Sequence, residues 1–227
     1  MSTPPKRKQP EEQALYFAVI DTETNWHDEV MSIGIVIADA ETKEKIDAVY
    51  YIIEPEYRVG GMYSGELRLD EEGVHVMDRE SALTEIKQWM DTYRVQKLFA
   101  YNAAFDKRHL PEYAAYRWYD IMRLAAYRQY NKAIPDTADC CKTGRLKWGY
   151  GVASVLKMLS KDSRYRESHN AVSDAEDELQ IMRLLGYELS VYETAFLADK
   201  KTAGNSSAQD FALAANGLCF GKVRENA

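Results

Sequence analysis

Cysteine is scarce in this chain of 227 residues: there are three, an odd number, and Cys140 and Cys141 are adjacent. This usage gives neither a framework of paired disulfides nor the ligand spacing of a zinc site. It favours a reduced, intracellular setting, and we expect a cytoplasmic protein.

Long apolar runs are also missing, because no segment approaches the roughly 20 residues that a membrane-spanning helix needs. The first ten residues are rich in proline, carry Lys6, Arg7 and Lys8, and have no apolar stretch of the kind that a secretion signal requires. We therefore expect no membrane association.

Positive charge is not in excess, since the formal net charge is -7. Proteins that grip long duplex DNA neutralise phosphates with lysine and arginine, so any nucleic-acid contact should be local. The length suits one core of ordinary size, and 46% hydrophobic and 29% charged residues are typical of a globular domain.

The order of patterns along the chain indicates an α/β fold. Residues 1–12 are polar, charged and proline-rich, and we expect a disordered tail. Runs of β-branched and aromatic residues predict strands at 15–20, 32–39, 48–53 and 96–101, with an irregular stretch at 54–78. Helical spacing of apolar residues predicts helices at 81–93, 103–113, 120–130, 152–159, 171–185, 190–200 and 210–215. Early strands and later interleaved helices indicate a sheet covered by helices.

The first of three polar clusters holds Asp21 and Glu23, directly after the predicted strand 15–20. Alternate strand residues point to the same face, so both carboxylates can reach one cation. Open α/β sheets place ligands at this end of their strands. For this cluster alone, a charged turn that closes the strand is the more common explanation.

The second cluster follows the predicted strand 96–101. Asn102 is a predicted N-cap, and Asp106 lies four residues further on, on the same face of the predicted helix. Phe105 is expected to point inward. The structural alternative is that Asp106 stabilises the positive end of its own helix.

The third cluster places Asp174 in the first turn of the predicted helix 171–185, with His169 five positions earlier in the approaching loop. A lone histidine is more often a packing residue, but here it accompanies four carboxylates. These are the ingredients for holding two divalent cations and activating a water, with His169 as a suitable base.

Taken together, Asp21-Thr22-Glu23-Thr24, Asn102-Ala103-Ala104-Phe105-Asp106 and His169-Asn170-Ala171-Val172-Ser173-Asp174 resemble the motifs of the DEDDh 3′–5′ exonucleases. This family of the RNase H-like superfamily includes DNA polymerase III epsilon-like proofreading subunits, RNase T and oligoribonuclease. The resemblance covers about residues 13–187, and His169 places it in the histidine branch. It implies an α/β RNase H-like fold with a mixed β-sheet and helices on both faces. It also implies an exonuclease domain at 13–187 and a helical extension and tail at 188–227.

The resemblance implies a role for each matched residue. Asp21, Glu23 and Asp174 would ligate one Mg²⁺ or Mn²⁺, Asp21 would bridge to a second ion held by Asp106, and His169 would take the proton from the attacking water. The expected substrate contacts are Thr22, Thr24, Trp26, Asn102 and Phe105. The expected partners are single-stranded DNA or RNA 3′ ends, with a possible homodimer.

Some positions depart from the family pattern or lie outside it. Tyr101 stands where many relatives carry histidine, and Asn25-Trp26 replaces a frequently small or glycine-containing pair. Trp26 could stack on a terminal base or simply pack in a turn. Asp120 reads as an N-cap.

Substrate preference is expected in loops rather than in the clusters. Basic and aromatic residues interleave in one loop, which suits a single strand as well as it suits a solvated surface: Lys142, Arg145, Lys147, Trp148 and Tyr150. Arg58 and Tyr63, beside Gly60-Gly61, form a second such candidate. Neither separates DNA from RNA, because that depends on a contact to the 2′-hydroxyl.

Two function hypotheses remain open from the sequence. The first is a metal-dependent exonuclease that acts on 3′ ends. The second is a catalytically inactive nucleic-acid-binding or polymerase-associated module of the same fold. Retention of all five site residues favours the enzyme.

Overall fold

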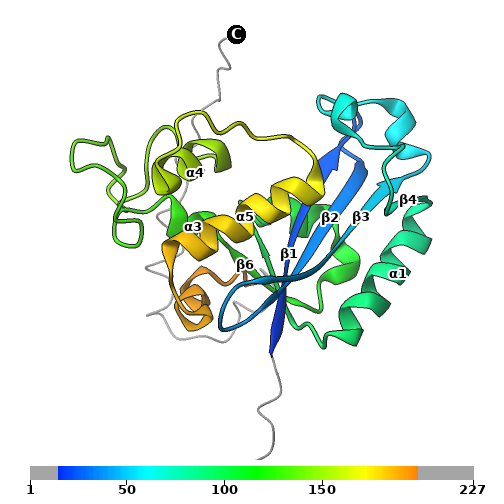
Figure 1. The fold of residues 1–227 in the computed structure, drawn as a ribbon, viewed down its shortest axis with the longest axis horizontal. Helices are drawn as coiled ribbons and strands as arrows, with labels where there is room; N and C mark the ends of the chain where they lie inside the picture. Colours follow the sequence, from blue (N-terminus) through cyan, green and yellow to red (C-terminus); the bar gives the residue numbers. More distant parts are fainter. Residues whose placement is uncertain (1–14, 199–227) are drawn as a thin grey trace, which may run out of the picture.

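The computed structural model describes residues 15–198, in which six strands form one mixed sheet of order β4-β3-β2-β1-β5-β6 (Figure 1). The strands are β1 (Tyr16–Thr24), β2 (Val30–Asp39), β3 (Lys45–Ile53), β4 (Val74–Met77), β5 (Lys97–Ala100) and β6 (Arg117–Asp120). β1, β2 and β3 are antiparallel neighbours, whereas β4 runs parallel to β3, and β5 and β6 run parallel to β1. The predicted tail at 1–12 and the predicted helix at 210–215 lie outside the described residues.

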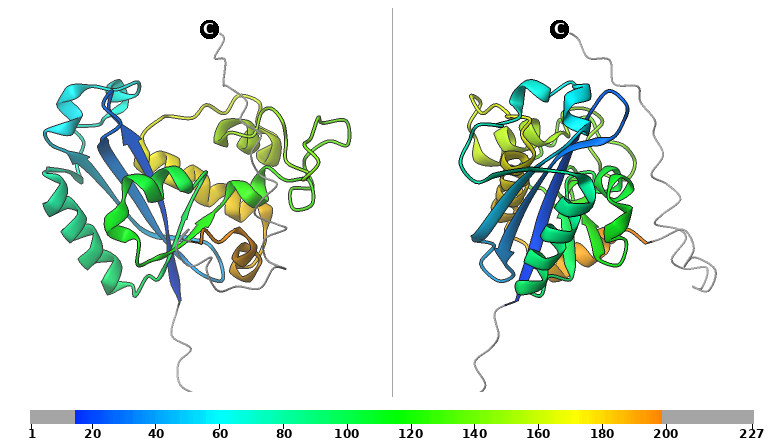
Figure 2. Two further views of the ribbon diagram at one scale, coloured as in Figure 1. Left: turned by 180° about the vertical axis from the view of Figure 1, so that it is seen from behind. Right: turned by 90° about the vertical axis from the view of Figure 1, so that its right-hand side faces the viewer.

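Helices lie on both faces of the sheet (Figures 1 and 2). The α-helices are α1 (Arg79–Thr92), α2 (Ala104–His109), α3 (Met122–Ala125), α4 (Val152–Ser160) and α5 (Ala171–Leu185). The 3₁₀ helices are η1 (Glu56–Val59), η2 (Ser64–Glu66), η3 (Pro111–Tyr113) and η4 (Leu189–Ala195). The predicted α/β architecture, a mixed sheet with helices on both faces, is therefore confirmed. Across residues 15–198 no helix combines the length and apolar content needed to span a membrane.

Successive side chains of β1 point to opposite faces of the sheet, and each face has its own hydrophobic core. Ala18 and Ile20 belong to the core beneath α1, whereas Phe17 and Val19 belong to the core beneath α4 and α5. Continuing this period of two places Asp21 and Glu23 on the α5 face and Thr22 on the opposite face. β1 extends beyond the predicted 15–20 because Asp21 to Glu23 still pair with β2.

Two short strands, β4 and β6, were not predicted. β4 lies inside the stretch 54–78 that we expected to be irregular, and it pairs with β3 at the edge of the sheet. β6 forms the other edge and pairs with β5. A four-residue strand is too short to show a clear period, so only its pairing partner identifies it.

The predicted helix at 120–130 is formed only in part, as α3 over Met122–Ala125, and the predicted Asn102 N-cap was wrong. Asp120 ends β6, and its Oδ1 accepts hydrogen bonds at 3.0 Å from the N–H groups of Met122 and Asn102. α3 stops at Ala125, whose carbonyl accepts a hydrogen bond from the Asn131 side chain at 2.7 Å. Asn102 has a left-handed backbone, φ 61°, and α2 begins after Ala103 with no side-chain cap.

The described part of the C-terminal segment packs against β6. Tyr192 in η4 is fully buried in the core beneath α5. The N–H of Leu197 donates to the carbonyl of Trp118 at 2.9 Å. η4 occupies most of the predicted helix at 190–200, in 3₁₀ rather than α form.

Candidate active site

The third cluster meets the first on the α5 face of the sheet. Glu23, His169 and Asp174 each offer a ligand atom, and these atoms lie within 4.8 Å of one another. Asp174 is buried in the first turn of α5, as predicted, and Asn170 caps that helix by accepting a hydrogen bond from Ser173 N–H. A strand and a helix start that are far apart in sequence thus share one site.

A glycine on β2 allows the start of α5 to lie this close to the sheet. Gly34 pairs with Asp21, and a Cβ atom at Gly34 would lie 2.1 Å from the backbone carbonyl carbon of Ala171. Real Cβ atoms essentially never come so close to backbone atoms. The start of α5 can therefore pack against the sheet at this position only because the residue beneath it is glycine. Gly34 therefore lets the start of α5, which carries Asp174, pack directly on the sheet beside Asp21.

The second cluster reaches the same strand from its other face. Asp106, on α2, is buried, and its Oδ1 accepts hydrogen bonds from Thr22 N–H at 3.1 Å and Thr22 Oγ1 at 2.8 Å. Asp106 also lies close enough to Asp21 to be the strongest charge acting on it. The structure therefore brings all five predicted catalytic residues to the C-terminal half of β1.

Burial and mutual repulsion perturb these carboxyl groups. Burial raises the pKa of Asp21 well above its usual value, and the charges of Asp106 and Glu23 add to the effect. Burial, followed by the charge of Asp174, raises the pKa of Glu23 to about 8. Burial also raises the pKa of Asp106 and of Asp174 to about 7 each. When ionised, these closely packed carboxylates repel one another, so the site favours a bound positive charge that offsets theirs.

Four buried carboxylate oxygens have no hydrogen-bond partner within the described residues, and all but Glu56 Oε2 belong to this cluster: Asp21 Oδ2, Asp174 Oδ1 and Glu178 Oε2. Orphaned buried oxygens are costly, and most native structures avoid them. Hard divalent cations such as Mg²⁺ and Mn²⁺ take carboxylate oxygens as ligands. The donor set therefore fits such ions.

Glu178 is a site residue that the sequence analysis missed. It is 2% exposed and lies one helical turn after Asp174 on α5. Burial, followed by the charges of Asp21 and Asp106, raises its pKa well above the usual value. The spacing of four from Asp174 could have identified it, because such pairs share a helix face.

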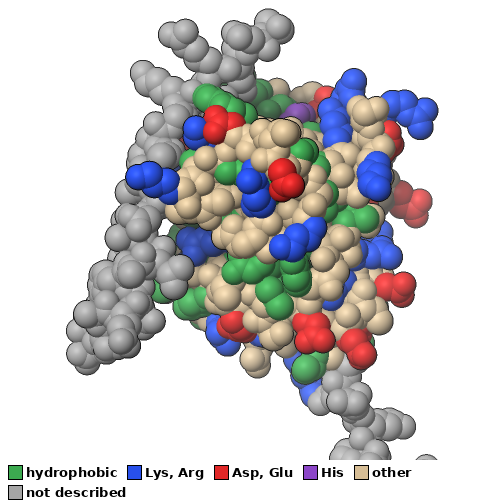
Figure 3. All heavy atoms as spheres, turned by 90° about the vertical axis from the view of Figure 1, so that its left-hand side faces the viewer, with side chains coloured by type: hydrophobic (Ala, Val, Ile, Leu, Met, Phe, Trp, Pro, Cys, Tyr) green, Lys and Arg blue, Asp and Glu red, His purple; other side chains and the backbone are tan. Residues whose placement is uncertain are grey.

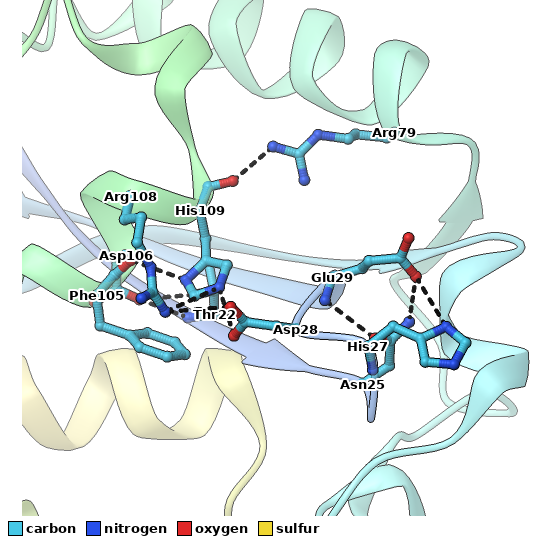
Figure 4. A network of polar contacts seen from close by, with 10 residues as sticks. All are labelled: Thr22, Asn25, His27, Asp28, Glu29, Arg79, Phe105, Asp106, Arg108 and His109. Carbon is cyan, nitrogen blue, oxygen red and sulfur yellow. Dashed lines mark hydrogen bonds and ion pairs between the residues drawn. The ribbon is translucent and has the colours of Figure 1, made fainter.

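The turn that carries Trp26 is tied to α2 by a polar network (Figure 4). Asn25 Oδ1 accepts hydrogen bonds from the N–H groups of His27 and Glu29 at 2.9 and 3.1 Å. Across the network, His109 Nε2 lies 3.0 Å from Asp28 Oδ1, and its Nδ1 lies 2.9 Å from the Phe105 carbonyl. The turn that carries Trp26 and the helix that carries Phe105 are thereby fixed relative to each other.

The predicted substrate contacts differ in their exposure. Trp26 is 66% exposed, and Asn102 is also exposed at the end of β5. Thr24 and Phe105 are partly buried, whereas Thr22 is buried and bonded to Asp106. A substrate can therefore contact Trp26, Asn102, Thr24 and Phe105 directly, but not Thr22.

The basic and aromatic loop at 142–150 is joined to the end of β5. Tyr101 donates a hydrogen bond to the carbonyl of Tyr150, and the Arg145 guanidinium lies 5.1 Å from the Tyr150 ring centroid. Trp148 is 74% exposed, and Lys147 pairs with Asp139 at 2.8 Å. Figure 3 looks onto the side of the molecule that carries this loop, where basic side chains are interspersed with acidic ones.

No family model matches the sequence, and no curated protein is similar enough in sequence to match. Solved structures do match in fold. The nuclease domain of 3′hExo, a DEDDh family member bound to rAMP, aligns with a TM-score of 0.53 at 14% identity, over 77% of this chain and 92% of that one.

Two further structures align comparably. One shows how a 3′-exonuclease specifically recognises the 3′ end of a histone mRNA stem-loop. It aligns with a TM-score of 0.54 at 15% identity, over 76% of this chain and 64% of that one. The other is E. coli exonuclease I in complex with a 5cy-dT13 oligonucleotide. It aligns with a TM-score of 0.52 at 13% identity, over 76% of this chain and 40% of that one. The chain thus spans less than half of exonuclease I, and it has the fold of the DEDDh 3′-exonucleases. The possible homodimer receives no support from these structures.

Proposed function

We propose that this chain is a metal-dependent 3′–5′ exonuclease of the DEDDh type that hydrolyses phosphodiester bonds at the 3′ end of single-stranded or frayed nucleic acid. One observation carries the proposal. Ligand atoms of Glu23, His169 and Asp174 lie within 4.8 Å of one another, and Asp21 and Asp174 each have a buried carboxylate oxygen without a hydrogen-bond partner among the described residues. The shared fold of the DEDDh 3′-exonucleases supports the same assignment.

The acids divide into two groups according to the face of β1 that they occupy. Asp21, Glu23 and Asp174, on the α5 face, would hold one Mg²⁺ or Mn²⁺. Asp106, bonded to Thr22 on the other side, would hold the second together with Asp21. Bound ions of this kind lower the pKa of a coordinated water and stabilise charge on the phosphate oxygens.

His169 is the proposed general base. One of its ring nitrogens accepts the proton of the attacking water, whose oxygen forms the new bond to phosphorus as the bond to the 3′ oxygen breaks. The products are a nucleoside 5′-monophosphate and a strand shorter by one nucleotide. A positioned base of this kind contributes roughly 10²- to 10⁴-fold to a rate.

The substrate is proposed to enter between Trp26 and the end of β5. Trp26 is exposed and held by a bonded turn, so its ring is available to stack on a base. The proposed approach is lined by Asn102, which lies between β5 and α2, by Phe105 on α2 and by Thr24 on β1. The matched structures contain rAMP and a single-stranded DNA oligonucleotide, which agrees with a single-stranded end for this chain.

One assay separates the enzyme from an inactive binding module. Purified protein is incubated with labelled single-stranded DNA and with RNA of the same sequence, in Mn²⁺ and then with excess EDTA. Shortening that stops with EDTA supports the enzyme, and the ratio of the two rates gives the sugar preference. Binding of either strand without shortening would identify the inactive module instead.

A further inference from the structure

His169 is in contact with an aromatic ring from a distant part of the chain. The rings of Tyr63 and His169 are stacked, with centroids 3.9 Å apart and planes inclined by 12°. Tyr63 lies between η1 and η2, in the connection from β3 to β4. Offset or parallel stacking of this kind fixes the plane of a ring without occupying its edge.

The segment that carries Tyr63, residues 56–68, is attached first to the turn after β1. Gly60 O accepts a hydrogen bond from Trp26 N–H at 2.9 Å, and Glu56 O accepts one from Asn25 Nδ2 at 3.0 Å. A Cβ atom at Gly61 would lie 2.6 Å from the Thr24 carbonyl oxygen. Residues 56–68 thus press closely against the end of β1.

The same segment also holds the loop of His169. Glu66 O accepts a hydrogen bond from Asn170 Nδ2 at 3.0 Å, and Arg68 Nη2 donates to Ser173 Oγ at 3.0 Å. His169 itself has a left-handed backbone, φ 54°, which a residue with a side chain adopts at some cost. Residues 56–68 therefore contact the His169 ring and two residues that follow it, Asn170 and Ser173.

No hydrogen bond to either ring nitrogen of His169 is found among residues 15–198. The ring is partly buried, and one of its nitrogens lies within 4.8 Å of carboxylate oxygens of Glu23 and Asp174. A general base is usually oriented by a third group, often a carboxylate or a carbonyl that binds its second nitrogen. Here the Tyr63 ring is the group that touches the imidazole.

We propose that Tyr63 is a positioning residue, which fixes the plane of the His169 imidazole by stacking on its face. This inference rests on the proposed function, because it gives His169 the role of base. The ring of Tyr63 rather than its hydroxyl carries the effect, so phenylalanine should replace it and leucine should not.

The kinetic test compares Tyr63→Leu and Tyr63→Phe with the wild type on a single-stranded oligonucleotide in Mn²⁺. Tyr63→Leu should lower kcat by about tenfold or more with KM nearly unchanged, because a misplaced base forfeits part of its contribution. Tyr63→Phe should retain most of kcat. An equal loss in both variants, or a loss confined to KM, would overturn the inference.

The spectroscopic test does not depend on activity. The ring current of Tyr63 displaces the imidazole proton resonances of His169 to high field, and the spectrum of His169→Gln assigns them. Tyr63→Leu should abolish this displacement and Tyr63→Phe should keep it. His75, which stacks on Tyr51 with centroids 4.8 Å apart, serves as the control for an intact fold and should not change.

The two readouts separate the failure of this inference from the failure of the proposed function. If the wild type cleaves nothing but the His169 displacement disappears in Tyr63→Leu, the stack exists and the exonuclease assignment fails. If the wild type cleaves and the displacement survives in Tyr63→Leu, the positioning role is wrong.

Discussion

Asp106 is hydrogen-bonded twice to Thr22, the residue between the two acids of β1. Its Oδ1 accepts from Thr22 Oγ1 at 2.8 Å and from Thr22 N–H at 3.1 Å. Because β1 alternates, this bond lies on one face of the strand while Asp21 and Glu23 point to the other. One strand therefore fixes both groups of acids at once.

Replacing Thr22 with valine should weaken the placement of Asp106. Valine has nearly the shape of threonine but lacks the hydroxyl, so one of the two bonds to a buried carboxylate is lost at a cost of about 1.5–3 kcal/mol. We expect weaker Mn²⁺ binding by calorimetry and slower cleavage. Thr22→Ser keeps the hydroxyl and is the control, and equal behaviour of the two variants would contradict this account.

The metal-free protein should lose stability as the pH rises. The pKa of Glu23 is raised from 4.5 to about 8, and that of Asp174 from 3.8 to about 7, so the folded state binds these protons more tightly than the unfolded chain does. Their favourable contribution is fully present below the unfolded values and is lost between about pH 4 and pH 8.

Denaturant titrations in EDTA at pH 5 and at pH 8.5 measure that loss. Glu23→Gln carries no titrating group at this position, so its stability should fall less over the same range. Mn²⁺ at pH 8.5 should restore the wild type. If the free energy of unfolding fell equally between pH 5 and pH 8.5 in the wild type and in Glu23→Gln, Glu23 would have an ordinary pKa in the folded protein, contrary to this prediction.

A side chain at position 34 should disturb the site without touching any acid. Gly34→Ala places its Cβ against the Ala171 backbone, and overpacking of this kind costs about 1–3 kcal/mol. We expect a lower melting temperature and strongly reduced cleavage, because the start of α5 must move away from Asp21. Gly65→Ala meets no atom within 4 Å and is the matched control.

Glu178→Gln should separate stability from metal binding. A neutral amide avoids the burden of a buried charge, so the EDTA-treated variant should be more stable than the wild type at pH 8. Loss of a supporting carboxylate should weaken Mn²⁺ affinity by roughly 10- to 100-fold. Glu176→Gln, which removes only an exposed pair with Lys45, should change neither property.

The sequence could predict that the five proposed catalytic residues lie together because each stands at a fixed place in a strong local pattern. Asp21 and Glu23 continue an apolar strand, and Asp174 falls in the first turn of a well-marked helix. β1, β2, β3 and β5, and helices α1, α4 and α5, were predicted within a few residues for the same reason.

What the sequence did not reveal depends on contacts between distant residues. Tyr63 lies in a stretch without periodicity, and only the fold brings it to His169. Asn102 looks like an N-cap, yet its N–H is taken by Asp120 from a neighbouring strand that was not predicted. Tertiary hydrogen bonds of this kind override local preference.

The central claim is that the acids around Asp21 hydrolyse nucleic acid from its 3′ end, and one gel tests it most directly. A single-stranded oligonucleotide labelled at its 5′ end is incubated in Mn²⁺ with the wild type and with Asp174→Asn. We predict a descending ladder of labelled products, one nucleotide shorter at each step, with the wild type and an intact strand with Asp174→Asn. Immediate release of a labelled mononucleotide, or an equal ladder with Asp174→Asn, would contradict the account.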